Sequence, residues 1–297
     1  MTTGRSFRAR PFRTPSGDEA PRGGALRRTV LAAALSGVLM PGFAGLGGAF
    51  SGALMLPAAA LAQENLLQES EDAPLAPPDA NTAKADAVLT GMSDFLAAQP
   101  GLSFRAGSFF DLDKNGDLVK RFVMHTVKLK RPDKVYFRSV FDDGNILEGW
   151  FDGKRYTLVR PLQKTYSVLD YTGTVDDFVQ YMEERFNIRL PLADVIYSNF
   201  MEQHDPFIVQ TSYLGDRTID NEHLDQVLVE LQDADWQIWV TAGPKPVPVR
   251  FLTTYLRPAS RPEYMASFYD WKFGAGPDSD YTGKIPAGFT ETDFGHD

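Results

Sequence analysis

The chain has 297 residues, 43% of them hydrophobic, no cysteine and a formal net charge of −9. The lack of cysteine excludes disulfides, thiol catalysis and a lipid-modified N-terminal cysteine. The acidic balance argues against nucleic acid as a partner and against docking on anionic lipid headgroups.

The N-terminal part of the sequence has the order of an export signal. Seven arginines within residues 5–28 precede an uncharged apolar stretch, residues 29–62, which ends in Ala60-Leu61-Ala62. Secretory signals have a basic segment, an apolar run and a small-residue site in this order, so we expect cleavage after Ala62 and a periplasmic location. Prolines and glycines interrupt the apolar run, which disfavours a retained membrane anchor. Arg27-Arg28 resembles a twin-arginine signal, so both export routes stay open.

The rest of the chain is expected to be one domain behind a linker. Residues 63–81 hold three prolines among small and acidic residues, which is typical of a disordered linker. Of the 30 basic and 39 acidic side chains, seven and two lie within residues 1–62, which leaves 23 and 37 and a formal charge of −14. Residues 82–297 suffice for a single all-β or α+β domain.

The domain is predicted to begin with a helix and to continue as a meander of strands. Apolar residues recur at helical spacing from Val88 to Leu96, and Pro100-Gly101 ends that run. Short alternating segments then follow one another through turns such as Asn115-Gly116. The predicted strands are residues 104–112, 118–130, 135–141, 146–151, 154–159 and 164–169.

Two predicted helices interrupt the strands in the middle of the chain. Thr174 is placed to cap the first helix, with Asp176 and Asp177 in its first turn, and Pro191 is placed to open the second. Alternation then resumes, and it puts Trp236 and Trp239 on opposite faces of one strand. The later predicted strands are residues 208–213, 224–231, 235–241, 249–255, 264–273 and a final edge strand within 289–294.

Several short motifs occur in an order that resembles a family of uncharacterised, predicted periplasmic proteins, which is similar in fold to the outer-membrane lipoprotein carriers LolA and LolB. The resemblance covers most of residues 82–273. It implies an α+β fold: a large curved antiparallel sheet, or incomplete barrel, with helices covering its concave apolar face. In the carriers such a cavity holds acyl chains. The motifs are Lys130-Arg131-Pro132-Asp133-Lys134, Phe151-Asp152-Gly153-Lys154-Arg155-Tyr156, Leu190-Pro191-Leu192-Ala193-Asp194, Asp235-Trp236-Gln237-Ile238-Trp239, Pro248-Val249-Arg250 and Tyr269-Asp270-Trp271.

Apolar residues of the strands and of the helical insert are the candidate ligand-binding residues. Each is equally compatible with ordinary core packing, because the sequence does not show whether the protein fills its own interior. The candidates are Phe137, Trp150, Phe178, Met182, Phe186, Ile196, Trp236, Phe251 and Trp271.

No catalytic residue, metal site or cofactor is assigned. Residues 111–117 match the first half of a calcium loop, but Phe122 stands where the bidentate Glu is needed, so a polar hairpin turn is the better interpretation. His125 lies in a strand beside charged neighbours and is expected at the surface. His204 and His223 lack the spacing of a zinc site, and no serine lies in a G-x-S-x-G segment.

Three functional hypotheses follow. The first is a non-enzymatic periplasmic binding or carrier protein for an apolar ligand, such as a lipid or an acylated protein. The second is an interaction or sensor module that binds an envelope protein through the same fold. The third is a hydrolase whose site has no sequence signature. Nucleic acid is excluded as a partner, and the oligomeric state stays open.

Overall fold

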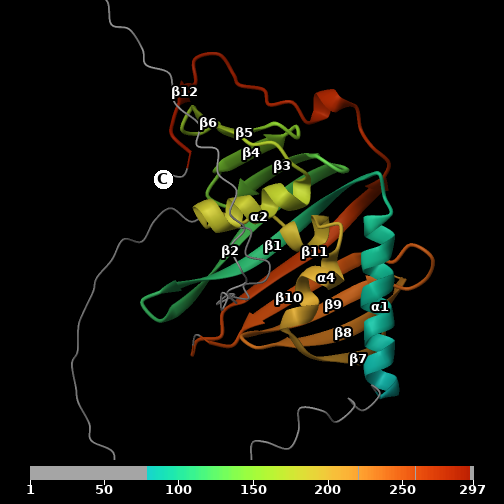
Figure 1. The fold of residues 1–297 in the computed structure, drawn as a ribbon. Helices are drawn as coiled ribbons and strands as arrows, with labels where there is room; N and C mark the ends of the chain where they lie inside the picture. Colours follow the sequence, from blue (N-terminus) through green and yellow to red (C-terminus); the bar gives the residue numbers. More distant parts are fainter. Residues whose placement is uncertain (1–78, 220, 258, 295–297) are drawn as a thin grey trace, which may run out of the picture. The chain divides into compact units, whose positions relative to one another are not determined.

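The computed structural model describes residues 79–219, 221–257 and 259–294 (Figure 1). The expected signal segment, the cleavage site at Ala62 and almost all of the expected linker lie outside these ranges. Within them, no helix combines the length and the apolar character needed to cross a membrane.

One sheet of twelve strands dominates the described residues (Figure 1). Its strand order is β12-β6-β5-β4-β3-β2-β1-β11-β10-β9-β8-β7, so β12 and β7 form two open edges. The strands are β1 Gly101–Lys114, β2 Asp117–Lys130, β3 Lys134–Phe141, β4 Ile146–Phe151, β5 Arg155–Arg160, β6 Thr165–Asp170, β7 Ile208–Ile219, β8 Glu222–Leu231, β9 Ala234–Thr241, β10 Pro248–Tyr255, β11 Glu263–Phe273 and β12 Thr290–Glu291.

Two meanders, β1 to β6 and β7 to β11, meet in the middle of this sheet. Within each meander, consecutive strands pair antiparallel and are joined by turns or short loops, whereas β1 pairs with β11 across most of the chain length. The sheet is antiparallel except at one edge, where β12 pairs with β6 in parallel. The α+β class and the open, incomplete barrel are confirmed.

The α-helices precede the first strand or lie between the two meanders of the sheet. In α1, Ala80–Ala97, the Asp79 carboxylate accepts the first backbone N–H groups. In α2, Val175–Phe186, Thr174 caps the helix as predicted, and the Asp177 side chain in turn accepts from the backbone N–H of Thr174. Pro191 does not open the next helix, because Leu192 follows it in the left-handed region with a φ of 57°. The remaining short helices are α3 Ala193–Ile196, α4 Phe200–His204, and the 3₁₀ turns Asp205–Phe207 and Asp278–Asp280.

Alternate strand residues face the side of the sheet on which α1, α2 and α4 lie, here called the inner face (Figure 1). In β9, Trp236 and Ile238 are buried, whereas Gln237 and Trp239 are half-buried. The predicted opposite orientation of Trp236 and Trp239 is therefore confirmed. The inner-face residues and the covering helices form the main hydrophobic core.

Side chains of α1 cover part of the edge strand β7. The Asn81 amide donates to the carbonyl of Tyr213 (2.8 Å) and accepts from the N–H of Tyr213 (2.9 Å). Thr82 Oγ1 donates to the carbonyl of Thr211 (3.2 Å). Asn81 thus takes the place of a neighbouring strand at this point of the edge.

The β1–β2 hairpin extends past both neighbouring strands. β11 pairs with β1 as far as Phe110, and β3 pairs with β2 from Val123. At the tip, Asn115 and Gly116 have φ values of 58° and 94°. This confirms the polar hairpin turn expected there.

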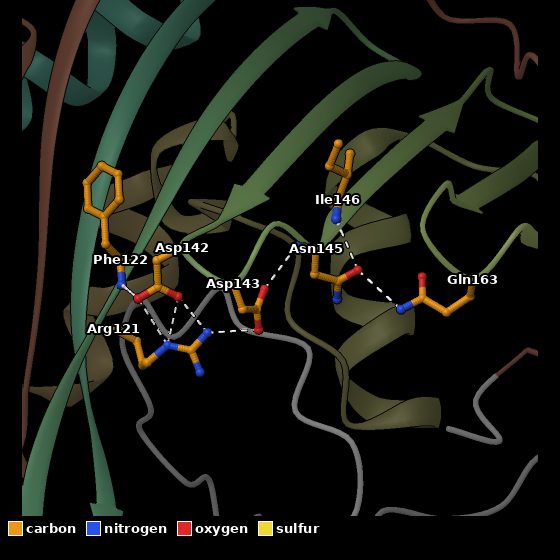
Figure 2. A network of polar contacts seen from close by, with 7 residues as sticks. All are labelled: Arg121, Phe122, Asp142, Asp143, Asn145, Ile146 and Gln163. Carbon is orange, nitrogen blue, oxygen red and sulfur yellow. Dashed lines mark hydrogen bonds and ion pairs between the residues drawn. The ribbon is translucent and has the colours of Figure 1, made fainter.

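Arg121 connects the projecting hairpin to the β3–β4 turn (Figure 2). Its guanidinium donates to Asp142 (2.7 Å) and Asp143 (2.9 Å), and the backbone N–H of Phe122 also donates to Asp142 (3.0 Å). The hydrogen bond from Arg121 lowers the pKa of Asp142. Exposed ion pairs contribute little stability, so the network mainly fixes the direction of the hairpin.

Candidate functional site

The structure brings eight of the nine candidate residues together on or over the inner face. Phe186 and Trp271 are half-buried at the margin of the core. Trp150 alone lies apart from them. The six candidates that are at most 2% exposed within the core are Phe137, Phe178, Met182, Ile196, Trp236 and Phe251.

Helix α2 is in direct aromatic contact with the sheet. The ring of Phe178 stacks on Phe151 with centroids 4.2 Å apart and an interplanar angle of 13°, and lies 5.0 Å from Tyr156. Val179 and Met182 are also fully buried on this side of the helix. The inner face is therefore packed by the protein's own side chains beneath α2.

Trp236 forms a second aromatic cluster beneath α4. Its ring lies 5.3 Å from Phe251, 6.2 Å from Phe200 and 4.9 Å from the His204 imidazole. His204 Nε2 is 3.1 Å from Asp194 Oδ1. The two short helices α3 and α4 are therefore in contact beside the indole.

Trp271 reaches the inner face because β11 contains a bulge. Asp270 has a φ of 57°, and the register with β1 shifts beside it. An extra residue reverses the alternation of side chains, which brings Trp271 onto the same face as Phe268. The indole lies 4.5 Å from Phe104 and donates to the Pro248 carbonyl (3.2 Å).

Trp150 lies on the outer face. It alternates with Leu147 and Phe151, which belong to the core, and its ring contacts Tyr136 at 5.4 Å. The strand partner of Trp150 is Thr157, and a Cβ at Gly283 would come within 2.5 Å of Thr157. The C-terminal segment therefore covers this part of the outer face, and Trp150 is separate from the other candidates.

His125 is the clearest correction at residue level. It is 1% exposed on the inner face, not at the surface, and its Nδ1 lies 2.9 Å from Ser139 Oγ. Burial lowers the pKa of His125 to about 4, so the imidazole is neutral at neutral pH. The signal that shows this is its phase, because His125 shares the period-two phase of Val123 and Val127, which both face the core.

A cover segment, residues 187–207, connects α2 to β7. It contains α3 and α4, and neither helix has a side-chain cap at its N-terminus. Asn187 and Leu192 have φ values of 54° and 57°, a region that is strained for a bulky residue such as Leu192.

Solved structures similar to this chain have low sequence identity to it. An uncharacterised conserved protein from Thermus thermophilus has a TM-score of 0.40 at 10% identity, with 71% of this chain and 99% of that chain covered. A LolA superfamily protein from Nitrosomonas europaea has a TM-score of 0.34 at 12% identity, with 67% and 97% covered. The lipoprotein LppX from Mycobacterium tuberculosis has a TM-score of 0.39 at 8% identity, with 69% and 99% covered.

No curated protein matches the sequence at a significant level. The family described as "Predicted periplasmic protein (DUF2092)" matches residues 85–295, which is well over half of the chain and almost all of the described domain. The match takes in both meanders of the sheet, α2 and the cover segment. The chain therefore belongs to this family of predicted periplasmic proteins.

Proposed function

We propose that the protein is a periplasmic, non-enzymatic binding or carrier protein for an apolar ligand, such as a lipid or an acylated protein. The supporting observation is the construction of the inner face. Its apolar residues are covered by helices and by the cover segment, not by a second sheet (Figure 1). The helices can move away without breaking a hydrogen bond between two strands.

An apolar ligand can replace the contacts that the covering elements make in the closed protein. Phe178, Val179 and Met182 are at most 2% exposed against the sheet. Uncovering them would cost about 25 cal/mol for each Å² of apolar surface that water reaches. A ligand chain lying between α2 and the inner face removes the apolar surface of both from water again, which offsets this cost.

The experiment has two parts. Lipid extracted from protein purified from the periplasm is identified by mass spectrometry, and the delipidated protein is titrated with an apolar fluorescent probe. We expect bound lipid and saturable probe binding. Absence of both would contradict the proposal.

Variants in α2 test the location of the site. Met182 is fully buried, so Met182→Asp is expected to unfold the protein. Phe186 is half-buried at the margin, 5.0 Å from the Phe294 ring, so Phe186→Asp places a charge beside the site while the fold is retained. The matched control is Gln180→Asp on the exposed side of the same helix. Of the two variants that should fold, we expect Phe186→Asp to weaken probe binding and Gln180→Asp to bind as the wild type does. Equal binding by these two variants would show that the probe does not bind beside α2.

One observation favours the interaction module as a second candidate. The projecting β1–β2 hairpin exposes Phe109 (45%), Leu118 (37%) and Val119 (37%), and Phe109 packs beside Phe122 at 4.9 Å. A folded wild type that binds no probe, together with the packed interior beneath α2, would favour this candidate over the carrier.

A further inference from the structure

A row of buried polar residues, here called the polar stripe, crosses the inner face. It spans six neighbouring strands, from β9 through β10, β11, β1 and β2 to β3. Every member is at most 2% exposed. The residues are Trp236, Thr253, Tyr264, Ser108, His125 and Ser139.

The strand register shows that the stripe is continuous. Thr253 is directly opposite Trp236 on one side and Tyr264 on the other. Tyr264 Oη and Ser108 Oγ are 2.8 Å apart. Ser108 is opposite Val123, two residues from His125, so these two are diagonal neighbours.

Three atoms of the stripe have no hydrogen-bond partner among the residues that the structure describes. They are Trp236 Nε1, Thr253 Oγ1 and His125 Nε2. Buried polar atoms are normally paired, and each exception requires a physical explanation. Two of the three, Trp236 Nε1 and Thr253 Oγ1, belong to residues directly opposite each other on β9 and β10, so both side chains lie on the same part of the inner face.

The chemistry of these atoms selects a neutral acceptor. The indole Nε1 only donates, and the Thr253 hydroxyl can donate or accept. His125 is neutral at neutral pH because burial lowers its pKa to about 4. No side chain of the stripe then offers a charge to a phosphate or a carboxylate, whereas an ester or amide carbonyl accepts from both donors.

We infer that the polar stripe binds the neutral, carbonyl-bearing part of an amphiphile, an ester or amide, while its hydrocarbon chain lies on the apolar remainder of the inner face. This inference rests on the proposed function and narrows its ligand from any apolar molecule to an acyl ester or amide. The Trp236–Thr253 pair is the centre of the site.

The test compares two ligands and two variants. Methyl laurate and tetradecane have chains with the same number of backbone atoms and differ in the ester. Thr253→Val removes the hydroxyl and keeps the shape of the side chain. The matched control is Thr254→Val, one residue away on the opposite face of β10. Dissociation constants are measured by displacement of the apolar probe, and melting temperatures are measured without ligand.

We expect the wild type to prefer methyl laurate to tetradecane. Thr253→Val should raise the dissociation constant for methyl laurate about three- to tenfold, the range for one net hydrogen bond, and leave that for tetradecane unchanged. The melting temperature of the ligand-free variant should stay equal or rise, because an unpaired buried hydroxyl is removed. Thr254→Val should change neither affinity.

Three results would contradict the inference. If Thr253→Val binds both ligands as the wild type does, the stripe is not the site, although the proposed function stands. A lower melting temperature with unchanged ester binding would show that a buried water pairs with the hydroxyl instead. If the wild type binds neither ligand, the proposed function fails together with the inference.

Discussion

His125 makes the stability of the fold depend on pH. Its pKa is about 4 in the folded protein, because of burial, against 6.5 for an unperturbed histidine. Between these values the unfolded chain binds more protons than the folded protein. The free energy of unfolding is therefore expected to fall as the pH drops from 6.5 to 4, by about 3 kcal/mol in total from this residue.

Replacing His125 by Asn should remove this contribution. Urea denaturation at about pH 7 and about pH 4.5 should show a smaller loss of stability in the variant than in the wild type. The exposed carboxylates whose pKa is lowered, such as Asp142, lose stability equally in both proteins, so the comparison isolates His125. The control, exposed His223→Asn, should keep the wild-type dependence, and an unchanged slope in His125→Asn would refute the assignment.

For single residues, period-two alternation along a strand predicts which face a side chain points to better than the charge of its sequence neighbours does. It placed Trp236 and Trp239 correctly, and it would have placed His125 inside and Trp150 outside if phase alone had been followed. Trp271 is different, because the bulge at Asp270 reverses the phase. Only the pairing with β1 reveals that bulge.

At the scale of elements, helix α2 begins at a capping box formed by Thr174 and Asp177. Loss of this box should destabilise the first turn of α2 where the helix packs on the sheet. Thr174 Oγ1 accepts from the N–H of Asp177, and the Asp177 carboxylate accepts from the N–H of Thr174, both at 3.1 Å. Thr174→Ala should lower the free energy of unfolding by about 1 kcal/mol. It should also speed hydrogen exchange at Asp177 and Phe178, whereas Thr174→Ser should retain wild-type values. Equal exchange in both variants would show that the box does not hold the helix.

Element boundaries were predictable where local pattern and tertiary structure agree. The strands of the first meander begin and end within three residues of the predicted limits, because turn residues separate them. β7 was predicted too short, since Gly215-Asp216-Arg217 resembles a turn but pairs with β8. The helices α3 and α4 are too short to have a periodic signal, and packing over the sheet determines them.

At the scale of the whole molecule, helix α1 covers part of the open edge strand β7, because Asn81 pairs with the backbone of Tyr213. Asn81→Ala should expose the N–H and the carbonyl of Tyr213, which then can pair with a strand of another copy. We expect greater self-association than in the wild type, measured by sedimentation velocity over a range of concentrations. Asp94→Ala on the exposed side of α1 is the control, and equal behaviour of the two variants would contradict the covering role of α1.

The strand order could not be obtained from the sequence. Alternation shows that a segment is a strand but does not show its partner, unless a short turn joins the two. The β1–β11 and β12–β6 pairs connect segments far apart in the chain. For the same reason the polar stripe was not predicted, because Trp236 and Ser108 come together only through β10 and β11.

The pairing of β1 with β11 also sets an order of assembly. Arg105 and Asp270, on these two strands, are 165 residues apart in the chain, so one side of β1 has no partner while the later strands have yet to emerge. The hairpins of the first meander form quickly from local contacts, and the closing step waits for a distant segment. In that interval the chain presents a long unpaired strand, and an unpaired strand edge can pair with another chain until β11 is available.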